Sequence, residues 1–311
     1  MNKAITLLKA GNVCALPTET VYGLAADATN TQAVAQIYTL KNRPHFNPLI
    51  VHITSLQQAH EIAEISDKNA QCCAYFWDQK YPLTVVLPLK KGHLMSPLVT
   101  AGLGTIALRM PHHPIMAEII HAVGPLAAPS ANRSMHISPT TAEHIRSSFG
   151  DQTPHIVDAG PCRVGVESTI IDLSQQRPNL LRAGGVAVEA LEAYFKETLF
   201  QLNTNYDKGH TSPTLLAPGM MRKHYAPKCP VVLGVTTKQP GDVLLGFGAD
   251  IHDTSDFNLS PTGDLTEAAA NLFSALYYLE NLNPKRIIVS PIPSYGLGLA
   301  INDRLKRAAA Q

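Results

Sequence analysis

The sequence predicts an α/β fold made of a larger first block, with a twisted, mixed open sheet covered by helices, and a small Rossmann-like second block. Short β-rich runs alternate with helical patterns along most of the chain, which is typical of sheets covered by helices. The periodicity stops between about Asn203 and Cys229, where turn formers and three prolines occur without a repeat. It then resumes with two buried-strand runs and a long amphipathic helix.

The first block, residues 1–202, is predicted to begin with a helix. Its opening stretch MNKAITLLKAGNVCALP has a short apolar patch with a second lysine inside it, unlike a signal peptide. A second helix is predicted at 31–42 from its apolar spacing, and a third at 113–124, after a proline and before a glycine. The predicted strands, with their adjoining turns, are 11–24, 47–53, 82–89, 105–111, 125–132, 155–160, 168–174 and 179–185.

The second block, residues 230–311, is predicted to follow the order β-β-α-β-α. Its central helix shows an apolar stripe at helical spacing, and Asp264 with Glu267 resembles a capping box at its start. The preceding segment, 203–229, is longer than an ordinary connection, and loops of that length are usually lids or linkers. We therefore expect a linker or lid between the two domains.

Composition bounds the class of protein. The chain has 311 residues and is 45% apolar, enough for a large core and for two domains. No apolar run approaches the roughly 18–20 residues needed to cross a membrane. The five cysteines show no C-x-x-C spacing, which favours a reducing, cytoplasmic compartment. Cys72 and Cys73 are expected to pack in a helix.

Charge narrows the search for a site. The net charge is +1, and residues 1–200 contain 15 Lys and Arg against 15 Asp and Glu. A ligand-binding site for an anion would therefore need its cations concentrated in one place. Lys41 and Arg43 are candidates, since the nearest acidic residues in sequence are Asp27 and Glu61.

The common nucleotide and metal motifs are missing. The chain has no G-x-x-x-x-G-K-[ST] loop, no G-x-G-x-x-G turn after a strand and no H-E-x-x-H helix. The pair His112–His113 precedes a proline and is interpreted as a surface turn rather than a metal site.

Polar residues instead cluster where predicted strands end. The stretches are PTETVYGL (17–24), PSAN (129–132), VEST (166–169) and LLRAGG (180–185). Ligands of open α/β sheets lie at such strand ends, although the hydroxyls would equally serve to satisfy turn backbone groups. Arg109 is hard to explain as core, because an unpaired buried arginine costs several kcal/mol. Lys41, Arg43, Arg109 and Arg182 form a candidate anion-holding set, with solvated surface cations as the alternative.

An ordered series of these stretches resembles the YrdC-type threonylcarbamoyl-AMP synthases. The series comprises PTETVYGL, KNRPHFNPLIVHI, TIALRMP, PSAN followed by SPTT, VESTIID, LLRAGG and PGMMRKHYAP. GLGLAINDRLKRAA (296–309) resembles the end of the long, two-domain branch. The resemblance spans nearly the whole chain.

The resemblance implies an enzyme that converts L-threonine, bicarbonate and ATP into L-threonylcarbamoyladenylate and pyrophosphate, the first step towards threonylcarbamoyladenosine in tRNA. It implies a YrdC-like first domain, Mg²⁺ delivered with ATP rather than held by protein side chains, and a downstream tRNA threonylcarbamoyl-transferase machinery as partner, with a weak tRNA contact. Lys41 and Arg43 would stabilise the phosphates, and no covalent nucleophile is expected. His52 would act as a base or, in the preferred interpretation, position threonine.

By resemblance, the residues that would contact threonine are Thr20, His52, Arg109, Ala128 and Ser168. Those that would contact ATP are Arg43, Asn47, Thr105, Ser130, Ser138, Arg182 and Tyr225, with Lys41 and Asn132 in the same motifs. Tyr225 would also close the linker over the nucleotide. Two positions depart from the family pattern: Met135 stands where glycine is usual, and Ala183 where proline is usual.

Two other functions remain open on the residues. A YrdC-like fold without turnover would serve as an RNA-binding module, although the neutral first block and the lack of an aromatic platform weigh against it. A carbamoyltransferase acting on carbamoyl phosphate would be expected to carry acylphosphatase and zinc-binding segments, which this sequence lacks.

Overall fold

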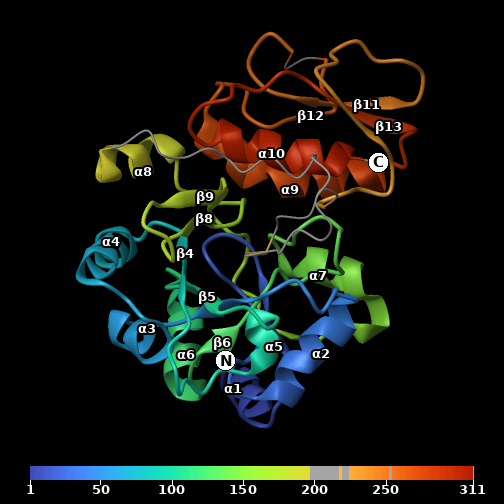
Figure 1. Ribbon diagram of the computed structural model, residues 1–311. Coiled ribbons are helices and arrows are strands. Elements are labelled where there is room, and N and C mark those ends of the chain that lie inside the picture. Colours follow the sequence, from blue (N-terminus) through green and yellow to red (C-terminus); the bar gives the residue numbers. More distant parts are fainter. Residues whose placement is uncertain (197–216, 219–223, 252–253, 311) are drawn as a thin grey trace.

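The computed structural model describes residues 1–196, 217–218, 224–251 and 254–310, which form two α/β units (Figure 1). The expected linker or lid, 203–229, lies mostly outside the described residues. Among the described residues, none of the helices is both long enough and apolar enough to cross a membrane.

The first unit is built on a nine-stranded mixed sheet in the order β7-β1-β2-β6-β3-β5-β4-β8-β9. The sheet combines parallel pairs, such as β3 with β5, and antiparallel pairs, such as β4 with β5. The strands are β1 (Cys14–Leu16), β2 (Gly23–Asp27), β3 (Ile50–His52), β4 (Leu83–Pro88), β5 (Thr105–Arg109), β6 (Leu126–Ala127), β7 (His155–Ile156), β8 (Thr169–Asp172) and β9 (Asn179–Arg182). The expected mixed sheet is confirmed, and every strand except β2 lies within its predicted stretch. The stretch 11–24 contains β1 and only the start of β2, which continues to Asp27.

The helices of this unit begin mostly at side-chain caps. Asn30, Ser55, Ser66 and Thr141 each accept a hydrogen bond from a first-turn backbone N–H, which satisfies groups that the helix leaves unpaired. The helices are α1 (Asn2–Lys9), α2 (Thr31–Lys41), α3 (Leu56–Ile62), α4 (Asp67–Asp78), α5 (Pro97–Thr100), α6 (Pro114–Val123), α7 (Ala142–Phe149) and α8 (Val188–Phe195), with a short 3₁₀ turn at Gly150–Gln152.

The two faces of the central strands carry different residues. Val51, Val85 and Leu108 point into the main core, where helices such as α2 and α4 pack. The alternate residues of the same strands point to the other face, and they include His52, Thr84 and Arg109. On that face a small apolar cluster, which contains Ile50, Val86, Ala107, Ile170 and Leu181, is covered by Ala217. The second face is therefore the one available for a site.

The second unit is a four-stranded parallel sheet in the order β10-β13-β11-β12, packed on two helices. Its elements are β10 (Val231–Leu233), β11 (Asp242–Gly246), β12 (Phe257–Asn258), α9 (Leu265–Asn281), β13 (Arg286–Val289) and α10 (Gly298–Ala309). The predicted order β-β-α-β-α is thus short by one strand, β12. Two residues are too few to produce a periodic pattern in the sequence.

The start of α9 differs from the expected capping box. Asp264 accepts hydrogen bonds from the N–H groups of Thr266 and Glu267, as expected. The reciprocal half runs through Ser260, whose hydroxyl donates to the Glu267 carboxylate and accepts from Asp264 N. An added serine therefore stands between the two partners that the capping box joins directly.

Helices α9 and α10 lie between the two sheets (Figure 1). Val21, Ile137 and Val166 of the first unit share one buried apolar cluster with residues of α9 and α10. Gly165 has a φ of +75°, and a side chain there would meet the backbone of Ala269 at 2.3 Å. The units are consequently in contact over the second face of the large sheet.

Candidate active site

The strand register aligns the candidate residues across five adjacent strands. His52 of β3 pairs with Arg109 of β5, which pairs with Thr84 of β4. Thr84 pairs in turn with Ile170 of β8, and Ile170 with Arg182 of β9, next to a bulge. Neighbouring strands lie about 4.8 Å apart, so the sheet itself positions the imidazole and the two guanidiniums in one row.

A narrow cavity of about 40 Å³ opens over this row. Of the residues expected in the site, those that line it are Arg43, His52, Arg109, Ala128, Ser130, Arg182 and Tyr225. Its wall is completed by Val21, Ile50, Pro129, Glu167, Pro218 and His224. Three guanidiniums and one carboxylate around a small space make this cavity a site suited to an anion.

Arg43 is held by neutral oxygens. Its Nε and Nη2 donate to the backbone carbonyls of Asn47 and Pro48 and to Asn47 Oδ1, at 2.6–3.1 Å. Burial lowers the pKa of Arg43 to about 10, still far above neutral pH. Asn47 therefore lies behind Arg43, and the guanidinium keeps its positive charge.

Lys41 is buried behind the cavity wall. Its Nζ donates to the backbone carbonyls of Ser130 and Asn132, and burial lowers its pKa well below the ordinary value, helped by the charge of Arg43. Asn132 Nδ2 bonds within its own loop, to the carbonyls of Arg133 and His136. Lys41 and Asn132 thus fix the PSAN loop, and the buried lysine is not the solvated surface cation that the sequence analysis left open as an alternative.

Arg109 has an internal partner that the sequence analysis missed. Its Nη2 donates to Glu19 Oε1 at 2.7 Å and to Thr20 Oγ1 at 2.9 Å. Glu19 thus supplies the charge compensation that an arginine in this buried position requires. Arg109 Nε and Glu19 Oε2 have no hydrogen-bond partner among the described residues, so each retains bonding capacity. The TET sequence offered the acidic residue, but its pairing across 90 positions left no local signal.

Arg182 fixes the VEST turn. Its Nε and Nη2 donate to the Ser168 carbonyl, Nη2 also donates to Ser168 Oγ, and Nη1 donates to the Pro218 carbonyl. Ser168 Oγ shares a further hydrogen bond of 2.7 Å with Thr84 Oγ1. Burial lowers the pKa of Arg182 to about 10, so this side chain also stays cationic.

Glu167 is a second wall residue that the sequence analysis missed. Ser138 Oγ donates to its Oε1 at 2.7 Å, and Arg304 Nε donates to its Oε2 at 2.9 Å. Burial alone would raise the pKa of Glu167, but the charges of Arg304 and Arg182 and the Ser138 bond outweigh it and lower the pKa to about 2. The expected residue Ser138 therefore orients a wall carboxylate.

His52 is neutral at physiological pH. Burial and the neighbouring Arg109 lower its pKa to about 3, and its Nδ1 has no hydrogen-bond partner in the described part of the chain.

Thr105 is set apart from the row. It lies at the opposite end of β5 from Arg109, opposite Pro88, and is the expected residue most distant along that strand.

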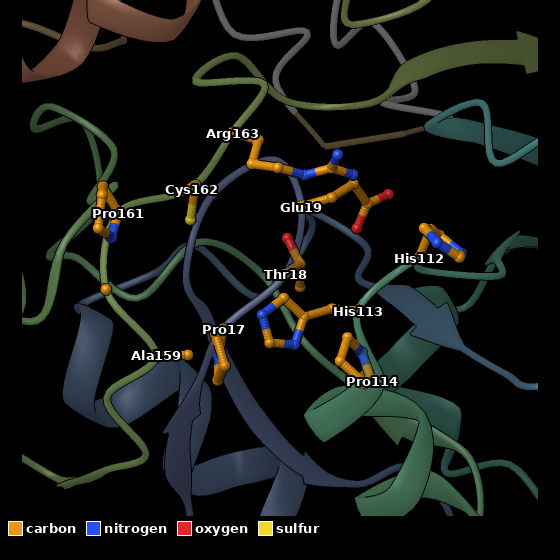
Figure 2. Close-up of a pocket in the computed structure, with 11 residues that line it drawn as sticks. Pro17, Thr18, Glu19, His112, His113, Pro114, Ala159, Pro161, Cys162 and Arg163 are labelled. Atoms are coloured by element: carbon orange, nitrogen blue, oxygen red, sulfur yellow. The ribbon is translucent and has the colours of Figure 1, made fainter.

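A larger cavity of about 380 Å³ lies on the other side of the 17–21 turn and contains none of the expected residues. Its lining includes Thr18, Glu19, His113 and Arg163. Figure 2 shows Thr18 and His113 near its centre, with Glu19 and Arg163 along one side. Of the pair predicted to form a surface turn, His112 is exposed and His113 is half-buried. The described residues contain no group of three or more His, Cys, Asp or Glu side chains placed to hold a metal ion.

The comparisons with known proteins cover both units. Residues 6–184 match the Sua5/YciO/YrdC family, described as "Telomere recombination", and residues 186–310 match "Threonylcarbamoyl-AMP synthase, C-terminal domain". A threonylcarbamoyl-AMP synthase of Pyrococcus abyssi is 37% identical, covering 98% of this chain and 93% of its own. One of Bacillus subtilis is 38% identical, covering 99% and 92%. The crystal structure of P. abyssi Sua5 complexed with L-threonine superposes with a TM-score of 0.87 at 35% identity, covering 99% of this chain and 93% of that one.

Proposed function

We propose a function from the premise that the chain belongs to the Sua5/YciO/YrdC family, in its two-domain form. The protein is an L-threonylcarbamoyladenylate synthase, an adenylyl-transferring enzyme that joins L-threonine, bicarbonate and ATP. The observation that supports it best in the molecule is the row of His52, Arg109 and Arg182 under one small cavity. Such a row suits a carboxylate at one end and phosphates at the other.

We assign the threonine carboxylate to Arg109. Its Nη2 is used by Glu19 and Thr20, whereas Nε has no hydrogen-bond partner among the described residues. His52 and Ala128 complete this end of the cavity. A neutral imidazole with a pKa of about 3 is a poor proton acceptor for an ammonium group. His52 is therefore assigned to positioning threonine. Thr20 and Ser168 are assigned to orienting the neighbouring side chains, Arg109 and Arg182.

The nucleotide is assigned to the other cations. Arg43 and Arg182 are held by carbonyl, amide and hydroxyl oxygens rather than carboxylates among the described residues, so their charge is available to phosphates. Ser130 and Tyr225 line the same space. The residues that line the cavity are supported from behind by Asn47, Asn132, Ser138 and Lys41. Thr105 would contact only a ligand that extends along β5.

The reaction needs a nucleophile and charge stabilisation. Bicarbonate gives CO₂ and hydroxide, and the free-base threonine amine attacks the carbon of CO₂. The amine proton that is lost combines with the hydroxide as water, which leaves a carbamate. A carbamate oxygen attacks the α-phosphorus of ATP, the bond to the bridging oxygen breaks, and pyrophosphate leaves. Negative charge develops on the phosphoryl oxygens, where the fixed cations Arg43 and Arg182 act.

Mg²⁺ is proposed to enter on the ATP phosphates. Its preferred oxygen ligands would then come from the phosphates and water, and it would add charge stabilisation at the leaving group. The threonylcarbamoyl anhydride is open to hydrolysis, so a cover over the site would protect it. Pro218, His224 and Tyr225 already contribute to the cavity wall, and we propose the 203–229 segment as that cover.

The surroundings of the reaction follow from its product. We propose that the adenylate passes to a tRNA threonylcarbamoyl-transferase machinery, with at most a weak tRNA contact by this chain, and that the protein works in the cytoplasm.

The test is pyrophosphate release from ATP by the purified full-length protein, with threonine and bicarbonate omitted in turn. Release that requires both, with serine a poor substitute, is the expected result. No release under any combination, together with salt-steep RNA binding, would overturn the synthase and favour an RNA-binding module.

A further inference from the structure

The C-terminal domain places a fully buried arginine against the cavity wall. Arg304 lies on α10 and has a relative exposure of 0%. Its Nε donates to Glu167 Oε2 at 2.9 Å, and its Nη1 donates to the Ala183 carbonyl and to Asp303 Oδ2 of its own helix, both at 2.8 Å. Glu167 and Ala183 belong to the N-terminal domain, and Glu167 lines the cavity. A side chain of the second domain therefore reaches the border of the active site.

The same guanidinium contacts a second wall residue. Its central carbon lies 5.3 Å from the centre of the Tyr225 ring, a favourable cation–π distance. Two further rings contact it, those of Phe273, stacked at 5.5 Å, and His224 at 4.0 Å. Tyr225 also has a φ of +61°, a conformation that persists only when the surroundings impose it. Arg304 is one of the groups packed against this ring.

Glu167 has an alternative use for its charge. It is the one carboxylate among the described lining residues of this cavity, beside the cations Arg43, Arg109 and Arg182. Held by Arg304 and Ser138, it is neutralised from behind. Without Arg304, Arg182 is left as a cation lining the same cavity whose charge already acts on Glu167. A carboxylate that pairs with Arg182 would oppose the entry of a phosphate chain.

We propose that Arg304 is a positioning residue of the nucleotide site, through which the C-terminal domain sets the affinity for ATP. It holds Glu167 away from Arg182 and supports the Tyr225 ring. The inference rests on the proposed function for the identity of the nucleotide, while its geometry stands on the contacts alone. It gives the C-terminal domain a direct part in substrate binding.

A purely structural role makes a different prediction, because the two domains are joined at other points. Tyr277 on α9 donates its hydroxyl to the Ile137 carbonyl at 2.9 Å. Ser274 shares a hydrogen bond of 3.0 Å with Thr140, and the shared apolar cluster is extensive. If Arg304 only joined the domains, removing another joint would have the same kinetic effect.

The experiment compares Arg304→Met with Arg304→Lys, and with Tyr277→Phe and Lys306→Ala as matched controls. Lys306 is an exposed cation on the same helix, and Tyr277→Phe removes the inter-domain hydrogen bond to the Ile137 carbonyl without removing either hydrogen-bond donor of the Glu167 carboxylate. We expect Arg304→Met to raise the KM for ATP and its calorimetric Kd about tenfold or more, with at most a twofold change in the KM for threonine. Arg304→Lys keeps the charge but not the forked contacts, so an intermediate value is expected, and the two controls should match wild type.

A double-variant cycle decides whether Arg304 acts through Glu167. In a Glu167→Gln background there is no carboxylate to neutralise, so Arg304→Met should add less than threefold to the ATP Kd. The proposal would be overturned if Arg304→Met raised the ATP Kd equally in both backgrounds, or if it weakened the binding of ATP and threonine equally. If Arg304→Met does not fold, Arg304→Lys decides: an unchanged ATP Kd in that folded variant would also overturn it. Failure of wild-type turnover would count against the synthase, whereas the ATP Kd values judge Arg304 separately.

Discussion

The buried cations around the cavity form two pairs that are held by different kinds of oxygen. One pair is Lys41 and Arg43, and the other is Arg109 and Arg304. The first two donate to backbone carbonyls and one amide. The other two donate to carboxylates, those of Glu19 and Glu167. Carbonyl dipoles hold a cation in place without cancelling its charge, whereas a carboxylate compensates it.

The difference separates two tasks. Burying a charge without a counter-ion costs stability, and the lowered pKa of Arg43 reports that cost. A phosphate chain can supply the missing counter-charge, so these cations favour the binding of an anion. The carboxylate-paired arginines have compensation already. Arg304 is suited to fixing neighbouring groups, whereas Arg109 keeps an Nε without a partner among the described residues, which we assign to the threonine carboxylate. The following changes test this division, from the largest expected effect to the smallest.

Replacing Glu19 by Ala should have the largest effect on stability. It leaves Arg109 buried without a counter-ion, and breaking a buried pair typically costs about 3–5 kcal/mol. Chemical denaturation would measure the free energy of unfolding. The exposed pair Arg146–Glu143 provides the control, since Glu143→Ala should cost at most about 1 kcal/mol. A stable Glu19→Ala protein would break the comparison, and adding Arg109→Met should restore part of the loss.

Replacing Arg43 by Ala should act on the ligand more than on the fold. The loss of charge-assisted hydrogen bonds to phosphate is expected to weaken ATP binding by about 1.5–3 kcal/mol, measured by calorimetric titration. The free energy of unfolding should change less than in Glu19→Ala. Wild-type ATP affinity in this variant would remove Arg43 from the nucleotide site.

Acid should destabilise the protein first through its buried histidines. His52 and His224 have pKa values lowered to about 3, and His144 to about 4, chiefly by burial. The folded protein therefore binds fewer protons than the unfolded chain, in which a histidine pKa is about 6.5. Each contribution is complete above about pH 6.5 and is lost as the pH falls toward the folded pKa, at up to about 1.4 kcal/mol per pH unit.

The ion pair of Glu167 with Arg304 should lose its stabilising contribution in a more acidic pH range. The pKa of Glu167 is lowered to about 2, so its stabilisation is lost only as the pH falls below the usual Glu range near 4.3.

Denaturation curves at pH 7, 6 and 5 would measure the loss of stability that the buried histidines cause. His144→Phe preserves a ring against Tyr277 and should reduce the slope between pH 6.5 and 5. An unchanged slope would show that His144 is not buried neutral.

Replacing Met135 by Gly should have the smallest effect. Met135 has a φ of +72° and is partly exposed, and a side chain in that region is strained. Relief of the strain is partly offset by the greater freedom of glycine in the unfolded chain, so a gain of about 0.5–1 kcal/mol in the free energy of unfolding is expected. A loss of stability would indicate that the methionine side chain makes useful contacts.

The sequence was informative where a residue's role follows from its position in a pattern. Polar residues at strand ends, such as His52 and Arg109, were correctly expected near one another, because strand register places such ends side by side. The partners of the buried cations were not predicted. Glu19 meets Arg109 across 90 positions, and Glu167 meets Arg304 across 137. Pairs so distant in sequence become visible only when the chain folds.

Met135 shows the opposite case. Its departure from the usual glycine was visible in the sequence, but the reason for that glycine was not. The positive φ, together with the hydrogen bond from Ala226 N to the Met135 carbonyl, shows that the backbone turns here to meet the residue after Tyr225. The backbone here takes a conformation that favours glycine, although the residue is methionine.

The position of Arg304 late in the chain also sets an order of assembly. Glu167 leaves the ribosome 137 residues before its partner, which at ordinary bacterial and eukaryotic synthesis speeds is roughly 7–27 s. During that time the strands of the N-terminal sheet can pair, but the wall of the nucleotide cavity lacks its rear support. A nascent or truncated chain would thus be folded in its first domain while still a weak consumer of ATP.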